Sequence, residues 1–176
     1  MGQVSREEAV ATLAAGRERL LALLGRLGED ERERRGTIGG GDWSAKDLLG
    51  HVAYWQELAL DSLAAWRRGE VPWAEAEVFR GPDGAEHAPN AADVERKRAL
   101  PYEEVLEVHE RTFRALIVEF HGFDDETWWS KAPYPAERRN RLGTMLGAVL
   151  GSDRGPFSHA EIHDDDLAAY VGSLNT

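Results

Sequence analysis

The stretch "HAEIH" at residues 159–163 places two histidines four positions apart. In a helix, side chains at i and i+4 lie on one side, about one turn apart, so both imidazoles can reach the same metal ion. The zincin protease motif HExxH uses this spacing, but Ala160 occupies the position of its glutamate base. The pattern therefore argues against a zincin protease, and by itself it is only a weak signal of a metal site, since helices also form this pair by chance. The alternative is a solvated helix face, because the acidic run 164–166 follows directly.

His51 strengthens the metal interpretation. It lies in "DWSAKDLLGHVAYW" at residues 42–55, on an apolar stripe between Leu48 and Trp55. Helical bundles build metal sites from side chains on facing helices. Three imidazoles with open coordination positions are typical of a catalytic divalent site, and imidazole suits zinc, nickel or iron. The sequence therefore predicts a metal site formed by His51, His159 and His163.

His109 competes with these three histidines. It follows Val105 by four residues and precedes Phe113 by four, so it too lies on an apolar stripe. A lone histidine in such a place is more often a core residue with a single hydrogen bond, and we rank it below the other three. His87 and His121 lie in loop-like composition and are predicted to be exposed.

Other side chains are expected to line the site without binding the metal: Trp43, Trp55, His109, Asp166 and Tyr170. Asp47 lies one turn before His51, where it could either orient that imidazole or cap the helix; we prefer the cap. No general base or other catalytic residue can be assigned from the sequence.

Helices must position these residues, because alternating β-branched runs typical of strands are absent. Long helices are expected at 5–27, 44–68, 101–120 and from about 142 to 171, with a short one at 91–99. Capping-box pairs open the first two, Ser5 with Glu8 and Ser44 with Asp47. Gly69 and Pro72 then end the second long helix.

These segments predict an all-α fold, a four-helix bundle in a single domain over residues 1–176, with long connections after the second and third helices. An array of αα-hairpins is the weaker alternative. The segment Ser152–Pro156 interrupts the last helix, and Pro156 is expected to restart it. If this interruption rotates the end of the helix, the three histidines need not converge.

Composition excludes several classes of protein. The 176 residues carry a net charge of −11, the opposite of the basic surface that nucleic-acid binding requires. No apolar run approaches the ~20 residues of a membrane helix, and no secretory signal is visible, so a cytoplasmic location is predicted. The absence of cysteine excludes disulfides, thiolate ligands and a cysteine nucleophile. Any thiol chemistry must therefore use a thiol from a substrate.

Together these stretches resemble a known family. "DWSAKDLLGHVAYW" is similar to the signature of the second helix in the DinB/YfiT-like superfamily of four-helix bundles, and "HAEIH" is similar to the HxxxH of its fourth helix. The chain most resembles the ClbS/DfsB branch, through "LPYEEVLEVHERTFRALI", "FDDETWW" and "RLGTMLGAVLGSDRGPFSHAEIH". The resemblance spans most of the chain in order and spacing.

The resemblance implies a divalent metal at His51, His159 and His163. It also implies thiol-dependent transferase or isomerase chemistry, or the hydrolase-like self-resistance activity of the ClbS branch. Homodimers are common among such proteins. We therefore expect a metal-dependent enzyme that acts on a small electrophilic molecule, either by thiol transfer from a low-molecular-weight thiol, which we prefer, or by hydrolysis.

Two alternatives remain open. The bundle could sequester a hydrophobic compound without turnover, in a cavity lined by Trp55, Trp66, Phe113 and Trp128, although at least half of these aromatics are expected to be plain core. It could also be a dimeric structural module with a vestigial metal site.

Overall fold

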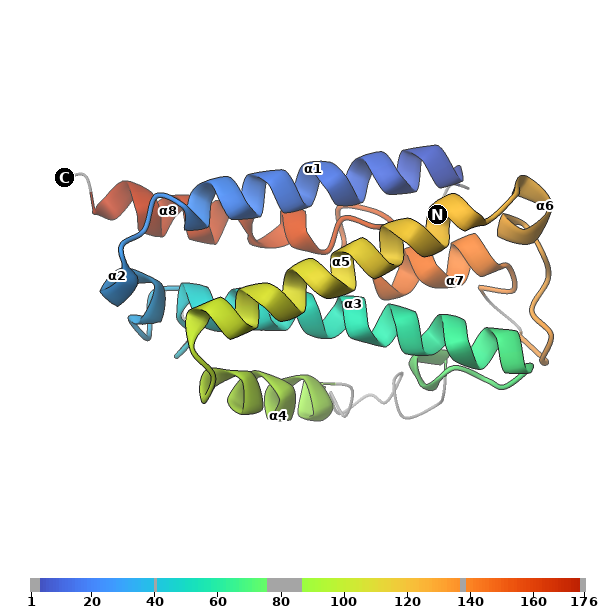
Figure 1. Cartoon of the computed structure of the whole chain (residues 1–176), viewed down its shortest axis with the longest axis horizontal. Helices are drawn as coiled ribbons and strands as arrows, with labels where there is room; N and C mark the ends of the chain where they lie inside the picture. The colour runs from blue at the N-terminus through green and yellow to red at the C-terminus, as the bar shows by residue number, and fades with distance from the viewer. Residues whose placement is uncertain (1–3, 40, 76–86, 137–138, 175–176) are drawn as a thin grey trace.

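The protein is a helical bundle, as the sequence predicts (Figure 1). The computed structural model describes residues 4–39, 41–75, 87–136 and 139–174. Within these ranges the regular elements are helices, and extended pairing is limited to isolated bridges such as the one between Ile38 and Trp43.

Three long helices and one broken helix form the bundle. They are α1 (Arg6–Leu24), α3 (Ala45–Arg68), α5 (Tyr102–Gly122) and the pair α7 (Leu142–Val149) and α8 (Asp164–Ser173). α3 packs against α5 and α7, while α1 packs against α5 and α8. The four positions of a four-helix bundle are thus filled, with α7 and α8 sharing the last one (Figure 1).

The connection after α3 contains a further helix, α4 (His87–Arg98), which lies along α3. It carries the chain back along the bundle, so that α3 and α5 run in the same direction (Figure 1). The buried ammonium of Lys97 fixes α4 to α3, with carboxylate oxygens of Glu57 at 2.6 Å and Asp93 at 2.5 Å. A buried lysine requires such partners, because an unpaired charge in the interior is costly.

The two predicted capping boxes are confirmed. Ser44 Oγ accepts from the backbone N–H of Asp47 at 3.1 Å, and the Asp47 carboxylate accepts from the backbone N–H of Ser44 at 2.9 Å. Ser5 and Glu8 make the same reciprocal pair at the start of α1. α3 ends at Gly69, whose φ of +74° is the left-handed conformation that glycine adopts without strain.

Short helices occur in segments that the sequence analysis left as loops: α2 (Glu29–Glu33), η1 (Trp73–Glu75) and α6 (Asp125–Trp128). α6 begins because Asp124 caps it, with the Thr127 backbone N–H donating to its carboxylate at 2.7 Å. The predicted exposure of His121 is confirmed, whereas the side chain of His87 lies outside the described residues.

The prediction for the last helix was wrong in one respect. The helix does not resume at Pro156, because Gly155 has a φ of +141° and Phe157 a φ of +64°, neither of which a right-handed helix allows. The chain instead turns through η3 (Ala160–His163), a 3-10 segment that leads into α8. The buried Phe157 ring stacks on Trp128 at 5.9 Å, and this packing offsets the strain at its backbone.

The apolar core forms two clusters, one at each end of the bundle. The first includes Phe120, Trp128 and Phe157, and the second includes Leu20, Leu48 and Leu167. α3 contributes to both, and His51 lies on α3 between Leu48 of the second cluster and Leu58 of the first. In the described part of the chain, no helix is long and apolar enough to cross a membrane.

Candidate metal centre

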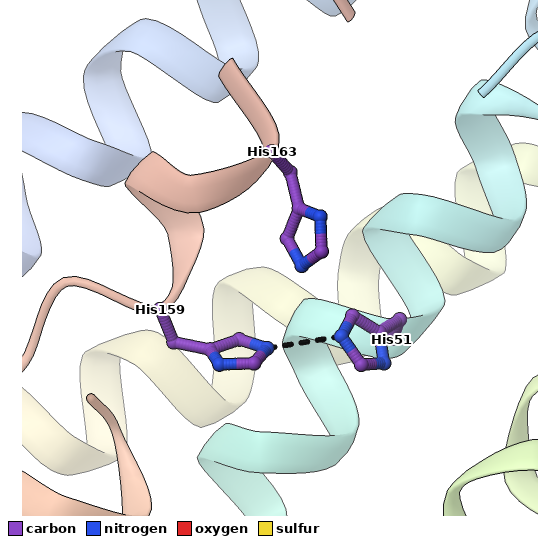
Figure 2. Close-up of side chains that lie close together, drawn as sticks. All are labelled: His51, His159 and His163. Atoms are coloured by element: carbon purple, nitrogen blue, oxygen red, sulfur yellow. Dashed lines mark hydrogen bonds between the residues drawn. The ribbon is translucent and has the colours of Figure 1, made fainter. Parts of the chain in front are cut away.

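His51, His159 and His163 converge, as the sequence predicts (Figure 2). One nitrogen from each ring can be chosen so that all three lie within 4.8 Å of one another. The centroid of the His51 ring is 4.9 Å from that of His159 and 5.0 Å from that of His163. The interruption at Ser152–Pro156 therefore does not separate the ligands.

The two C-terminal histidines do not lie inside a regular α-helix, in contrast to the prediction. His159 precedes η3 and His163 is its last residue. The turn is held from both sides: the His159 backbone N–H donates to the Leu150 carbonyl at 2.9 Å, and α1 approaches closely at Gly16. A Cβ at Gly16 would lie 3.2 Å from the Ala160 Cβ, so a side chain there would press on the turn.

The other nitrogen of each of two rings is fixed by an oxygen. His51 Nδ1 donates to Asn90 Oδ1 on α4 at 2.8 Å, and His159 Nδ1 donates to the Gly151 carbonyl at 3.2 Å. A carbonyl oxygen only accepts, so each Nδ1 carries the proton of a neutral imidazole. Each Nε2 is then left with a lone pair, the form in which histidine binds a metal.

The two Nε2 atoms face each other at 2.9 Å (Figure 2). With both protons on Nδ1, this contact brings two lone pairs together, which is unfavourable unless a cation lies between or beside them. A shared proton is a poor candidate, because burial and the two neighbouring histidines lower the pKa of His159 to about 3. A metal ion satisfies both lone pairs.

The spacing also fits a metal. Imidazole nitrogens bind zinc at about 2.0–2.1 Å, so two nitrogens at right angles around one ion lie about 3 Å apart. Two ligands of one ion cannot be more than about 4.2 Å apart. A pair of nitrogens at the outer limit of 4.8 Å would therefore have to approach by at least about 0.6 Å, and by more than about 1 Å to reach the tetrahedral separation of about 3.4 Å.

Compared with known protein families, residues 12–151 match the DinB superfamily. The chain belongs to the DinB superfamily. The match ends before His159, so the placement of the two C-terminal ligands rests on the geometry described above. No curated protein matches the sequence.

One solved structure has the same fold, an uncharacterised protein from Escherichia coli UTI89. It shares 12% sequence identity with this chain, with a TM-score of 0.76, and the superposition covers 99% of this chain and 96% of the other. At this identity the likeness shows the fold alone.

Around the third histidine, burial and charge act in opposite directions. Burial lowers the pKa of His163, while the carboxylates of Asp166 and Asp164 raise it, and burial dominates. His163 Nε2 is buried, and within the described residues it has no hydrogen-bond partner. In this DinB protein a divalent ion at His163 would therefore meet a neutral imidazole. The two nearby carboxylates would favour the positive charge of the ion.

An open cavity of about 330 Å³ lies on the outer side of His163. Trp43 and Asp166, both predicted to line the site, form part of its wall, and the Trp43 ring centroid is 4.9 Å from that of His51. Ile38 and Asp42 complete the wall from the segment before α3. This cavity gives a small molecule a route from solvent to the histidines.

The remaining predicted residues divide between the site and the core. Trp55 and His109 line a separate, inner cavity that also reaches His159. The structure does not bring Tyr170 to either cavity: it packs in the second core cluster, and its hydroxyl donates to the Glu31 carbonyl at 2.9 Å. Asp47 caps α3 as preferred, and it also pairs with Arg98 at 3.0 Å.

The aromatic residues considered for a binding cavity are mostly core. Trp128 is fully buried and Trp66 nearly so, both in the first core cluster. Phe113 is half-buried beneath the guanidinium of Arg17, 5.0 Å from the ring centroid. Trp55, in contrast, lines the inner cavity beside His159.

Sequence reasoning missed both oxygens that orient the rings. Asn90 stands immediately before the helix expected at 91–99, where an asparagine is ordinarily read as a helix cap. The helix instead begins at His87, and Asn90 points from its first turns to His51. The Gly151 oxygen belongs to the backbone, so residue type carries no signal for it. A Cβ at Gly151 would lie 2.4 Å from the Gly147 carbonyl oxygen, so glycine is required there.

Proposed function

We propose that this DinB-superfamily protein is a divalent-metal-dependent enzyme that acts on a small electrophilic molecule. The observation that carries the proposal is the pair of Nε2 atoms at 2.9 Å, each with its Nδ1 proton committed to an oxygen. His163 adds a third buried nitrogen beside them. Three neutral nitrogens leave coordination positions open, which is typical of catalytic rather than structural sites.

An ion held by these nitrogens would supply Lewis acidity, which lowers the pKa of a thiol or water ligand and gives a nucleophile near neutral pH. Zinc, nickel and iron(II) all suit an all-imidazole set. The protein's own residues orient the rings: Asn90 and the Gly151 carbonyl hold two of the imidazoles in the tautomer that binds a metal.

The outer cavity supports access for a small organic substrate. Its wall carries one aromatic ring, Trp43, and two carboxylates, Asp42 and Asp166. These carboxylates disfavour an anionic substrate, so a neutral or cationic electrophile fits better. The thiol, when the reaction is a thiol transfer, comes from a second small molecule, since the chain has no cysteine.

Thiol transfer remains the preferred reaction and hydrolysis the variant. The stretches similar to the ClbS/DfsB branch favour hydrolytic detoxification, whereas the wider superfamily favours thiol transfer. In both reactions the electrophile approaches the same three histidines. The two reactions therefore differ only in the nucleophile, which is a thiol in transfer and water in hydrolysis.

Metal content and turnover test the proposal in sequence. Untagged protein is assayed for bound metal by elemental analysis, and the loaded protein is then incubated with a panel of electrophiles (epoxides, strained rings and Michael acceptors) with and without glutathione-like thiols. We expect metal-dependent loss of at least one electrophile. Thiol-dependent adducts indicate transfer, and products formed in water alone indicate hydrolysis.

A second candidate function is sequestration of a small apolar compound. The apolar walls of the inner cavity, which include Trp55, Leu150 and Phe157, suit such a compound, although at about 20 Å³ the cavity would have to widen to hold it whole. Saturable binding without any product, equal in metal-loaded and metal-free protein, would support sequestration over catalysis.

A further inference from the structure

His109 has an unusual environment for a buried histidine. Its side chain is 0% exposed, on the inner face of α5, yet within the described residues neither ring nitrogen has a hydrogen-bond partner. Buried polar groups are nearly always hydrogen-bonded, so an orphaned pair of nitrogens on one ring requires an explanation. The ring stays neutral, because burial lowers the pKa of His109 to about 4.

The ring lines a small, partly open cavity of about 20 Å³ between α1, α3, α5 and the loop after α7. The volume is sufficient for an ordered water or for the end of a small molecule. His159 lines the same cavity, so the inner cavity borders the metal centre on the side away from His163 and Trp43.

Three other polar residues line this space: Thr12, Arg17 and Gln56. The amide of Gln56 is 4% exposed and is held at one end by Thr112, whose Oγ1 lies 2.6 Å from Gln56 Oε1. Apolar walls come from residues that include Leu13, Val52, Leu150 and Phe157. Small-molecule sites are usually apolar cavities of about 300–1,000 Å³ with a few converging polar groups, so this small space can receive only one end of a ligand.

No charge is available to a ligand in this cavity. The guanidinium of Arg17 is engaged by both Glu110 oxygens, at 2.9 and 2.6 Å, and it lies over the Phe113 ring. A charged ligand group would therefore be buried without a counter-ion, which is costly. A neutral oxygen is favoured, because a neutral imidazole can donate one hydrogen bond to it.

We propose that the inner cavity is a substrate subsite that binds a small neutral carbonyl group, with His109 donating to the carbonyl oxygen and Gln56 beside it. The role of this subsite in turnover rests on the proposed function and deepens it. The subsite would place the carbonyl end of the electrophile next to His159. His109 is then a specificity-determining residue, not a metal ligand.

Three probes of equal size test the subsite: acetone, its oxygen-free isostere isobutene, and acetate, which adds a charge. Each is titrated into metal-free protein, and ¹⁵N NMR of the histidine rings reports on His109 directly. We expect saturable shifts of the His109 nitrogens with acetone, and binding about tenfold tighter than that of isobutene, the preference expected for one buried hydrogen bond. Acetate should not compete.

His109→Phe keeps the bulk of the ring and removes both nitrogens, so the preference for acetone over isobutene should disappear. His109→Gln restores a donor and should recover part of it. His121→Phe, an exposed histidine on the same helix, is the matched control and should behave as wild type. Equal binding of acetone and isobutene to wild type, or an acetone preference that survives in His109→Phe, overturns the proposal, and so does the absence of saturable acetone binding.

The metal proposal and the subsite proposal fail separately. The titration uses metal-free protein and reads out His109, so a chain that never binds metal can still show the subsite. Conversely, His109→Phe should retain wild-type metal content. If this variant loses both its bound metal and acetone binding, His109 is not separate from the metal ligands.

Discussion

His159 and His109 line the same inner cavity, and the surroundings of their rings differ in one respect. The Gly151 carbonyl fixes Nδ1 of His159, so its other nitrogen is aimed and ready to bind a cation. The ring of His109 has no such partner among the described residues. We therefore interpret the oriented ring of His159 as a metal ligand and the unpartnered ring of His109 as facing a space for a neutral hydrogen-bonding molecule.

Burial lowers the pKa of both residues, and the contrast between them appears in the smaller causes. Burial is the largest cause in each case, but His159 is also affected by His51 and His163, whereas His109 is affected by Glu110 and Arg17 in opposite directions. A metal ion would therefore satisfy the Nε2 lone pair of His159 among the other two histidines, and it would leave the surroundings of His109 unchanged. Four substitutions or conditions can break or sharpen this distinction.

Removing a ligand should have the largest effect. In His163→Ala the site keeps two nitrogens, so zinc affinity should fall by more than about 100-fold, beyond the 10–100-fold cost of losing an outer partner. Competition with a chromophoric chelator measures the affinity. His121→Ala, at an exposed position on α5, is the matched control. Wild-type affinity in His163→Ala would remove this residue from the ligand set.

Acid should destabilise the metal-free protein through His109. The pKa of His109 is about 4 in the folded protein, below the ordinary histidine value of 6.5, so the unfolded chain binds more protons between these two pH values. The stabilisation from keeping this ring neutral is complete above pH 6.5 and decreases as the pH falls, by roughly 3 kcal/mol at pH 4. Urea unfolding at several pH values measures it.

The variant His109→Phe should show a shallower decrease in the free energy of unfolding over that range. Other buried histidines, including His159, contribute to the remaining slope. If His109→Phe and wild type lose stability in parallel as the pH falls, His109 is not buried in its neutral form.

Loss of an orienting oxygen should have an intermediate effect. Asn90→Ala removes the acceptor at 2.8 Å from His51 Nδ1, so zinc affinity should fall about 10–100-fold without loss of the fold. Asn140→Ala, at an exposed position before α7, is the control and should bind zinc as wild type does. Equal affinities for the two variants would mean that α4 plays no part in the metal centre.

Loss of a helix cap should have the smallest effect. Ser44→Ala removes the acceptor of the Asp47 backbone N–H and should lower the free energy of unfolding by about 1 kcal/mol. Zinc affinity per folded molecule should change little, because this cap stabilises α3 without contacting a ligand ring. A large loss of affinity with unchanged stability would assign the Ser44–Asp47 pair to the metal site instead.

Residue spacing was sufficient to predict the parts of this molecule that depend on local interactions. Ser5, Ser44 and Gly69 act within one turn of the helix ends that they define, and the stripe from Leu48 to Trp55 places His51 inward. The histidine ligands could be proposed because three inward imidazoles are a recognisable donor set.

The features that escaped prediction depend on tertiary contacts. The break before His159 is held by packing of Phe157 on Trp128 in a conformation that phenylalanine rarely adopts by itself. Asn90 reaches His51 only because α4 folds back along α3, and Tyr170 is drawn to Glu31 by a hydrogen bond between α8 and α2. His109 was considered both as a core residue with one hydrogen bond and as a residue lining the site; it is buried and lines the inner cavity, but the structure gives its ring no partner among the described residues.

Metal content tests the central claim most directly. Untagged protein, purified without chelator and then equilibrated in turn with zinc, nickel and iron(II), should retain close to one ion per chain of at least one metal after extensive dialysis, and His51→Ala and His163→Ala should retain almost none. A folded wild-type chain that retains no ion, or variants that retain as much as wild type, would contradict a metal centre formed by His51, His159 and His163.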